Sequence, residues 1–326
     1  MREQAWSGAA RDRLTPLSRG ASPATLRLDR ISRRLMQACA VLSIVVVALV
    51  VVFLGVRALP VVTQIGVGPF FGSTNWDPDA GIGFGAPGGF GALTPIGGSM
   101  VAVALALLLS VPVALCVALA VAEVAPRLGE RVIRPAVEIF VGIPSVVYGW
   151  IGLTTLVPML RHFARGGNDG SGYLAAAVVL AVMVLPTIAT LAADSLQALP
   201  PGLKEGSYAL GATQWQTIRR VLLPAARGGI ISGVVLGLAR AMGEALAVAL
   251  VIGDVNRLPD FAHRGLGALV QPGTTMTVTI TDGINNLAIN PQGTAARYML
   301  GLVLLLIVFA SISVIRALGQ RGAARA

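Results

Sequence analysis

The chain has 326 residues, of which 55% are hydrophobic and only 12% are charged, and its mean hydropathy is +0.77. Soluble globular domains carry about 25% charged residues, so this chain has too few charges to cover its apolar surface in water. The composition therefore excludes soluble enzymes and soluble binding modules, and it predicts an integral membrane protein.

Basic residues exceed acidic ones by 25 to 15, which gives a net charge of +10, and Lys204 is the one lysine. Most of the arginines flank hydrophobic segments, which favours contact with the anionic cytoplasmic leaflet over nucleic-acid binding. The two cysteines, Cys39 and Cys116, lie within apolar runs and cannot form a disulfide framework.

Six segments are apolar and long enough to cross a bilayer, which takes about 20 residues. They predict an all-α membrane fold with six transmembrane helices. The predicted spans are 35–56, 99–122, 136–160, 173–193, 229–253 and 298–318. Pro112, Pro144 and Pro186 lie inside three of these spans and predict bends there.

The basic residues also predict the orientation of the chain. Seventeen of them lie in the two tails and the connections at 123–135 and 194–228, and Arg316 lies at the end of the last span beside the C-terminal tail, whereas six lie in the alternate connections. Because cytoplasmic loops carry the excess of arginine and lysine, both termini are expected in the cytoplasm of a bacterial cell. An even number of spans agrees with that orientation.

The segments between the spans differ in character. The Arg-rich tail 1–34 lacks periodicity and is expected to be a disordered cytoplasmic segment. The outer loop 57–98 follows the first span. A second long outer connection covers 254–297, and its stretch 275–281 alternates threonine with apolar residues. That stretch is compatible with either a strand or a short surface helix.

The connection 199–228, called here the 199–228 loop, has a clear local pattern. Residues 204–210 predict a short helix that Gly211 ends in a left-handed conformation. Thr213 followed by Gln216 is a capping box, which begins a second helix. On that helix one apolar face is expected, formed by Trp215, Ile218 and Leu222. Such a helix–Gly–helix unit is suited to docking into a groove of a partner protein.

At this loop the sequence resembles the EAA loop of ABC-importer permeases. Glu205 is followed six residues later by Gly211 and then by Val221-Leu222-Leu223-Pro224, although Gly206 and Ser207 replace the two alanines of the motif. The resemblance implies that the region docks in a cleft of a separate ATPase subunit. The implied coupling residues are Glu205, Gly206, Ser207, Tyr208, Ala209, Leu210, Gly211 and Ala212.

The chain is not expected to hydrolyse ATP itself. A P-loop needs a lysine within Gly-x-x-x-x-Gly-Lys-Ser/Thr to reach the phosphates, and Lys204 lies between Leu203 and Glu205. We therefore expect a non-catalytic subunit with no cofactor or metal of its own, in which ATP and Mg²⁺ belong to the partner ATPase.

The fifth span carries small residues and a charged pair. Gly229, Gly233 and Gly237 recur every four residues, a pattern that allows close helix packing in lipid. Arg240 and Glu244 follow one helical turn apart. They are compatible with an ion pair that neutralises itself, but a buried charge costs about 2.5–3.5 kcal/mol on insertion scales, which favours residues that line an aqueous path.

Three further segments resemble permeases of the phosphate-specific (Pst) importers, in particular the PstC type. They are Arg240-Ala-Met-Gly-Glu244, the stretch from Glu138 to Gly149, and Trp76-Asp-Pro78 together with 90–96. The matches extend from about residue 57 to 253, and Gly98-Ser99 departs from the commoner Gly-Thr.

The resemblance implies a MetI-like permease core over 99–318, with the first span added and a short cytoplasmic tail at 319–326. It also places Arg240 and Glu244 on the phosphate pathway. The implied partners are a PstA-like second permease, a PstB-like ATPase dimer and an extracytoplasmic PstS-like phosphate-binding protein, with inorganic phosphate as substrate and lipid around the spans.

Three alternatives remain at this point. A permease for another oxyanion, such as molybdate, sulfate or phosphonate, shares the 199–228 loop but not the Trp76 segment. An intramembrane protease needs a nucleophile and a base at membrane depth, whereas His162 and His263 lie in predicted outer loops. A passive channel is the third alternative. It differs from an importer of phosphate or of another oxyanion because its transport requires no ATP.

Overall fold

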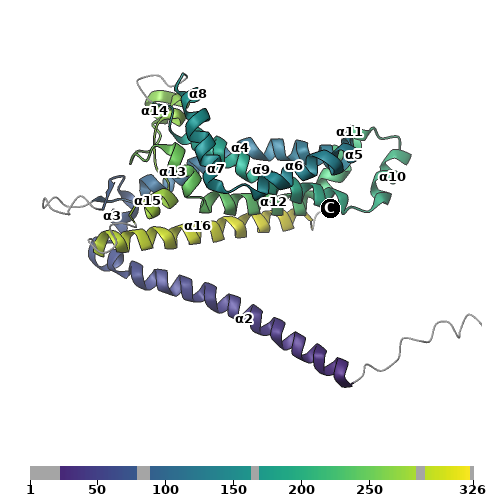
Figure 1. Ribbon diagram of the computed structural model, residues 1–326, viewed down its shortest axis with the longest axis horizontal. Coiled ribbons are helices and arrows are strands. Elements are labelled where there is room, and N and C mark those ends of the chain that lie inside the picture. The colour runs from purple at the N-terminus through teal and green to yellow at the C-terminus, as the bar shows by residue number, and fades with distance from the viewer. Residues whose placement is uncertain (1–22, 79–88, 163–168, 284–290, 324–326) are drawn as a thin grey trace, which may run out of the picture. The chain divides into compact units, whose positions relative to one another are not determined.

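The computed structural model describes residues 23–78, 89–162, 169–283 and 291–323 (Figure 1). The chain divides into two compact units, residues 1–53 and 54–326. Apart from one antiparallel ribbon, β1 (Trp76–Asp77) with β2 (Gly89–Phe90), the regular structure in the described ranges is helical.

The first unit is described from Pro23, where helix α2 (Pro23–Pro60) begins. Its side chains from Arg30 to Phe53 are almost all exposed although most are apolar, as expected for a helix surrounded by lipid. The predicted disordered tail is wrong for residues 23–34, because arginine, leucine and alanine favour helix and extend the span backwards. Residues 1–22 lie outside the described ranges.

Within the described residues, five helices are long and apolar enough to span a membrane, and one bent pair of helices adds a sixth span when counted as one. This confirms the predicted six-helix membrane architecture. The spanning helices of the second unit are α4 (Leu93–Leu119), α9 (Tyr173–Gln197), α12 (Leu223–Gly243), α16 (Pro291–Ala323) and the pair at 126–161.

Shorter elements continue, interrupt or join these helices. Several are wide π-helical turns, in which each hydrogen bond reaches five residues along the chain. Some of them lie within the candidate spans and others connect the spans. In chain order these shorter elements are η1 (Val61–Ile65), α3 (Val67–Gly72), η2 (Ala120–Val124), α5 (Pro126–Leu128), η3 (Gly129–Ile133), η4 (Gly152–Leu156), α8 (Val157–Arg161), α10 (Pro201–Ala209), α11 (Gln214–Thr217), η5 (Ile218–Leu222), α14 (Phe261–Arg264) and the 3₁₀ turn η6 (Gly265–Val270).

Helix α9 lies at the centre of the second unit and packs against both α4 and α12. Helix α12 meets α9 through the small-residue ridge. A methyl group added at Gly229 would overlap the Ser195 side chain, and one added at Gly237 would lie 2.8 Å from the Ile188 side chain. Glycine at these positions is what lets the two helices approach closely.

The third span is bent. Helices α6 (Arg134–Gly142) and α7 (Ser145–Ile151) meet at an angle of 95° around Pro144. The bend predicted at Pro144 is therefore present, but the span expected as one segment over 136–160 is divided into separate helices, because proline cannot donate the backbone hydrogen bond that would continue α6. The Tyr148 hydroxyl fixes the bend by donating to the Phe140 carbonyl at 2.6 Å.

The fifth span also differs from its predicted range. A continuous helical segment starts at Gln214, and α12 ends at Gly243, where the backbone of Glu244 turns to an extended conformation. A separate helix, α13 (Leu246–Ile252), follows. The sequence predicted that Arg240 and Glu244 lie one turn apart on a single helix. This prediction is wrong, because Glu244 lies beyond the end of α12.

The stretch whose structure the sequence left open is helix α15 (Met276–Asp282), capped by the side chain of Thr275. It is not a surface helix, because Met276, Thr277, Val278 and Thr279 are all buried. Buried hydroxyls need partners, and Thr277 finds one in the Glu244 carbonyl at 2.8 Å. Helix α15 thus packs beside the break that follows α12.

Candidate functional site

The 199–228 loop lies at one end of the second unit, and helices α13, α14 and α15 lie at the other (Figure 1). Helix α10 follows Pro200 and ends before Gly211, whose φ of +82° is the predicted left-handed conformation. The predicted capping box is also present, because the Thr213 hydroxyl accepts from the Gln216 amide and the Gln216 side chain accepts from the Thr213 amide. Both local predictions for this loop are confirmed.

The helix that leaves the loop is attached to the bundle by a small apolar cluster. Ile218 and Leu222 are each only 3% exposed and pack with residues from the ends of α4 and α9. Trp215 was predicted to share their face, but it is 62% exposed. The π-helical turn η5 begins at Ile218 and shifts the side-chain register, so the buried stripe does not extend back to the first turn.

The outer surface of the loop carries large apolar side chains that the described part of the chain leaves exposed. Leu210 is 90% exposed, and Tyr208 and Leu203 are each 41% exposed. Glu205, between them, is also exposed. A cluster of exposed apolar side chains with a polar rim is typical of a protein–protein interface. The predicted coupling residues therefore form a continuous surface on α10 and the turn after it.

The second site surrounds Arg240, near the end of α12. Its Nη1 atom donates to the Thr187 hydroxyl on α9 at 3.2 Å, and its charge is within electrostatic range of the Tyr148 hydroxyl. Among the described residues this is the one hydrogen bond that the guanidinium makes. A guanidinium has five donors, so most of them remain available for a ligand.

Glu244 plays a different part from the one that the sequence suggested. Its carboxylate accepts from the Ala247 amide at 3.1 Å, which caps the start of α13, and its carbonyl accepts from Thr277. The described residues contain no ion pair between Glu244 and Arg240. The pair that merely neutralises itself is therefore not formed, and the charge of Arg240 is left without an acidic partner in this part of the chain.

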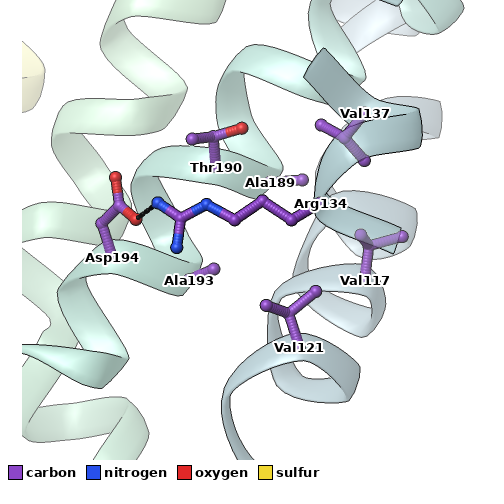
Figure 2. Close-up of a pocket in the computed structure, with 8 residues that line it drawn as sticks. All are labelled: Val117, Val121, Arg134, Val137, Ala189, Thr190, Ala193 and Asp194. Carbon is purple, nitrogen blue, oxygen red and sulfur yellow. Dashed lines mark hydrogen bonds and ion pairs between the residues drawn. The ribbon is translucent and has the colours of Figure 1, made fainter. Parts of the chain in front are cut away.

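A small pocket between α4, α6 and α9 contains a second arginine (Figure 2). Arg134 reaches between valines of the α4 segment and small residues of α9 to bind Asp194, with 2.7 Å between Nη2 and Oδ1. It also lies near Glu130 and Glu138, at 3.4 and 3.7 Å. The free volume of about 10 Å³ has room for one water molecule at most, so this pocket is a structural ion-pair cluster.

A larger cavity of about 160 Å³ opens at the end of the unit opposite the 199–228 loop. Asp254, at its edge, adopts a positive φ of +41° and accepts from the Thr274 hydroxyl at 3.0 Å. Burial raises the pKa of this carboxyl, and the negative charge of Asp282 raises it further, while the hydrogen bond from Thr274 lowers it. The cavity is lined by Trp76, Asp77, Pro78, Asp254, Asn256, Thr274, Thr279, Asp282 and Arg297.

Comparison with known proteins places this geometry in a family. Residues 110–322 match the family described as binding-protein-dependent transport system inner membrane component. The chain belongs to this family. It is 41% identical over 298 residues to the probable ABC transporter permease protein YqgH of Bacillus subtilis. The alignment covers 90% of this chain and 92% of the relative.

Relatives with a named substrate align over most of this permease as well. The phosphate transport system permease protein PstC of Mesorhizobium japonicum is 34% identical, with 95% of this chain and 97% of the relative covered. The PstC protein of Xylella fastidiosa is 36% identical, with 76% of this chain and 77% of the relative covered. The predicted membership of the binding-protein-dependent permease family is thus confirmed.

Some residues of the permease's two sites could not be identified from sequence. Thr187, the partner of Arg240, lies 53 positions away and directly after Pro186. Tyr148 occurs within a segment noted only for its resemblance. An isolated threonine or tyrosine in an apolar span carries no periodic signal, and only the packing of α9 against α12 brings the Thr187 hydroxyl to the guanidinium.

Proposed function

We propose that this chain is the permease subunit of an ATP-driven importer of inorganic phosphate. The observation that carries the proposal is the environment of Arg240, a cation inside the helix bundle. Within the described residues its hydrogen-bond partner is the neutral hydroxyl of Thr187. The proposal is supported by relatives named as phosphate transport permeases at 34% and 36% identity.

The chemistry of Arg240 suits a tetrahedral oxyanion. A guanidinium is planar, keeps its charge and presents donors in a fork that matches two oxygens of phosphate. An arginine at membrane depth without an acidic partner is costly, by about 2.5–3.5 kcal/mol on insertion scales. An anion that passes along the bundle offsets that cost while it is bound, so Arg240 provides a transient binding site. The Thr187 hydroxyl orients the guanidinium by accepting from it, and its own hydrogen can be donated to the anion.

Glu244 contributes to the same pathway through structure. Its carboxylate holds the start of α13 and its carbonyl holds α15, so it fixes the backbone break next to Arg240. We assign it a positioning role in the pathway rather than direct contact with phosphate.

The energy for import comes from a partner. The exposed surface of the 199–228 loop, from Glu205 to Ala212, is the contact for an ATPase dimer of the PstB type, in which ATP and Mg²⁺ are bound and hydrolysed. A second permease of the PstA type completes the pathway, and a phosphate-binding protein of the PstS type delivers the anion at the opposite end. This arrangement places both termini and the 199–228 loop in the cytoplasm, which agrees with the distribution of basic residues.

The test is phosphate uptake by proteoliposomes that hold the complete complex with either wild-type chain, Arg240→Gln or the control Arg257→Gln. Arg257 is an exposed arginine outside the bundle core, so its substitution removes the same charge without touching the pathway. We expect Arg240→Gln to lower uptake at least about tenfold, because a charge-assisted hydrogen bond contributes about 1.5–3 kcal/mol. Wild-type uptake by Arg240→Gln would show that the residue is structural.

Selectivity is measured in the same vesicles. Sulfate, molybdate and a phosphonate are offered in place of phosphate, each at the same concentration. Phosphate uptake above that of the other anions supports the proposal, and faster uptake of another anion assigns the chain to a different oxyanion importer.

A further inference from the structure

The chain's one lysine makes an ion pair between the 199–228 loop and the end of α4. Lys204, on α10, places its Nζ atom 2.5 Å from Oε2 of Glu123. Glu123 belongs to η2, the π-helical turn that ends α4, and is 81 residues away in sequence. The Glu123 side chain is only 9% exposed, whereas that of Lys204 is 37% exposed. The acid is thus buried at the end of a spanning helix and the base comes from the loop.

The second helix of the loop binds the same residue. The Gln214 side chain, at the start of α11, donates from Nε2 to the Glu123 carbonyl at 3.2 Å. That carbonyl is free for an external donor because the last carbonyls of a helix have no partner within it. The two loop helices are also joined to each other by the hydroxyls of Ser207 and Thr217, which lie 2.9 Å apart. Glu123 therefore receives one contact from each half of the loop.

The burial of Glu123 decides how much this contact matters. Exposed ion pairs contribute little to stability, but removing one partner of a buried pair leaves an uncompensated charge and is strongly unfavourable. If the loop moved away while the carboxylate of Glu123 stayed covered, that charge would be left unpaired in a poorly hydrated place. The ion pair therefore favours joint movement of the loop and the end of α4.

Helix α4 leads from this contact to the arginine site. It packs along α9, which carries Thr187, and Thr187 binds Arg240. A continuous set of packed elements thus connects the loop to the guanidinium, and Glu123 is its first member.

We propose that Glu123 is the positioning residue that transmits movement of the 199–228 loop to α4, through its ion pair with Lys204 and its carbonyl contact with Gln214. The proposal rests on the proposed function, since it assumes that an ATPase moves this loop. It assigns the pair to force transmission and leaves the ATPase contact to the exposed side chains of the loop.

The experiment exchanges the two charges in the complete complex. Glu123→Lys, Lys204→Glu and the double variant are compared with the wild type in proteoliposomes, and phosphate uptake and ATP hydrolysis are both measured. Arg127→Glu is the matched control, because this exposed residue lies four positions beyond Glu123 and undergoes the same charge change as Lys204→Glu. The readout is phosphate taken up per ATP hydrolysed, which a merely structural defect does not change.

Each single reversal is expected to lower this ratio about tenfold or more, because it places like charges together at a buried site. The double variant restores the opposite charges and is expected to recover most of the ratio, while Arg127→Glu keeps the wild-type value. A wild-type ratio in the single variants overturns the proposal. The proposal is also overturned if the double variant takes up no more phosphate per ATP hydrolysed than the single variants, whether the loss arises in assembly or in coupling.

A chemical cross-link provides a second measurement. Cysteines replace Glu123 and Lys204 in a chain whose Cys39 and Cys116 are changed to serine, and a short thiol-reactive cross-linker joins them. If the loop and the end of α4 move together, the cross-linked complex transports faster than the same variant before cross-linking. Loss of transport on cross-linking overturns the proposal.

The wild-type complex separates failure of this proposal from failure of the proposed function. If it shows no ATP-driven phosphate uptake, the proposed function itself is wrong. If it transports normally and the single reversals do so too, only the role of Glu123 is wrong.

Discussion

A methyl group added at Gly237 should destabilise the contact between α12 and α9. The added carbon would lie 2.8 Å from both Cγ1 and Cδ1 of Ile188, and that side chain is fully buried. Inserting a carbon into a close-packed contact costs about 1–3 kcal/mol. Replacing glycine by alanine also improves helix propensity by up to about 1 kcal/mol, which offsets part of that cost.

Gly228→Ala is the matched control, because a methyl group there has no atom within 4 Å. It keeps the gain in helix propensity without the overlap. We therefore expect Gly237→Ala to unfold more easily than Gly228→Ala, with a difference of about 1–3 kcal/mol in the free energy of unfolding. The measurement is equilibrium unfolding in mixed micelles with a denaturing detergent.

A second substitution tests whether Ile188 is the cause. Ile188→Val removes Cδ1, one of the two atoms in the overlap, so its cost should be smaller in the Gly237→Ala background than alone. Contacting residues of this kind show interaction energies of about 0.5–3 kcal/mol. Equal stability of the two alanine variants, or strict additivity with Ile188→Val, would refute the reasoning that the ridge of α12 sets its distance from α9.

Three further predictions concern the proposed sites. Glu205→Lys reverses an exposed charge on the docking surface, so it should release the ATPase from the purified complex; full co-purification would count against the docking role. Thr187→Val removes the hydroxyl that accepts from Arg240. The loss of a hydrogen bond worth about 1.5 kcal/mol should raise the KM for phosphate uptake roughly tenfold. An unchanged KM would show that Thr187 is dispensable. Because the pKa of Asp254 is raised in the folded chain, its ionisation opposes folding, and stability should fall as the pH rises from the ordinary aspartate pKa through the raised one. Unfolding measured from pH 4 to 7 should show a shallower fall for Asp254→Asn, and parallel curves would contradict the raised pKa.

The general architecture could be predicted from the sequence because its causes are local. A span of about 20 apolar residues has few alternatives to a membrane helix. The capping box at Thr213 and the left-handed Gly211 were also predictable, since each depends on residues within four positions. The glycine ridge of α12 predicted a close neighbour, although the sequence could not say that this neighbour is α9.

The details that failed depend on contacts between distant residues. Pro144 indicated a bend, but an angle of 95° depends on the packing of α7 against α13. The end of α12 at Gly243 depends on Glu244, whose carbonyl and carboxylate bind α15 and α13. The sequence showed two charges spaced for one helix, and nothing in it indicated that one of them would cap the next helix.

Phosphate uptake should be measured in vesicles that hold this chain and its second permease, with the phosphate-binding protein outside, ATP inside, and the ATPase either present or omitted. We expect uptake that requires both the ATPase and hydrolysable ATP, and no uptake when either is withheld. Phosphate uptake at the same rate without the ATPase would contradict this expectation, because the chain would then conduct the anion unaided.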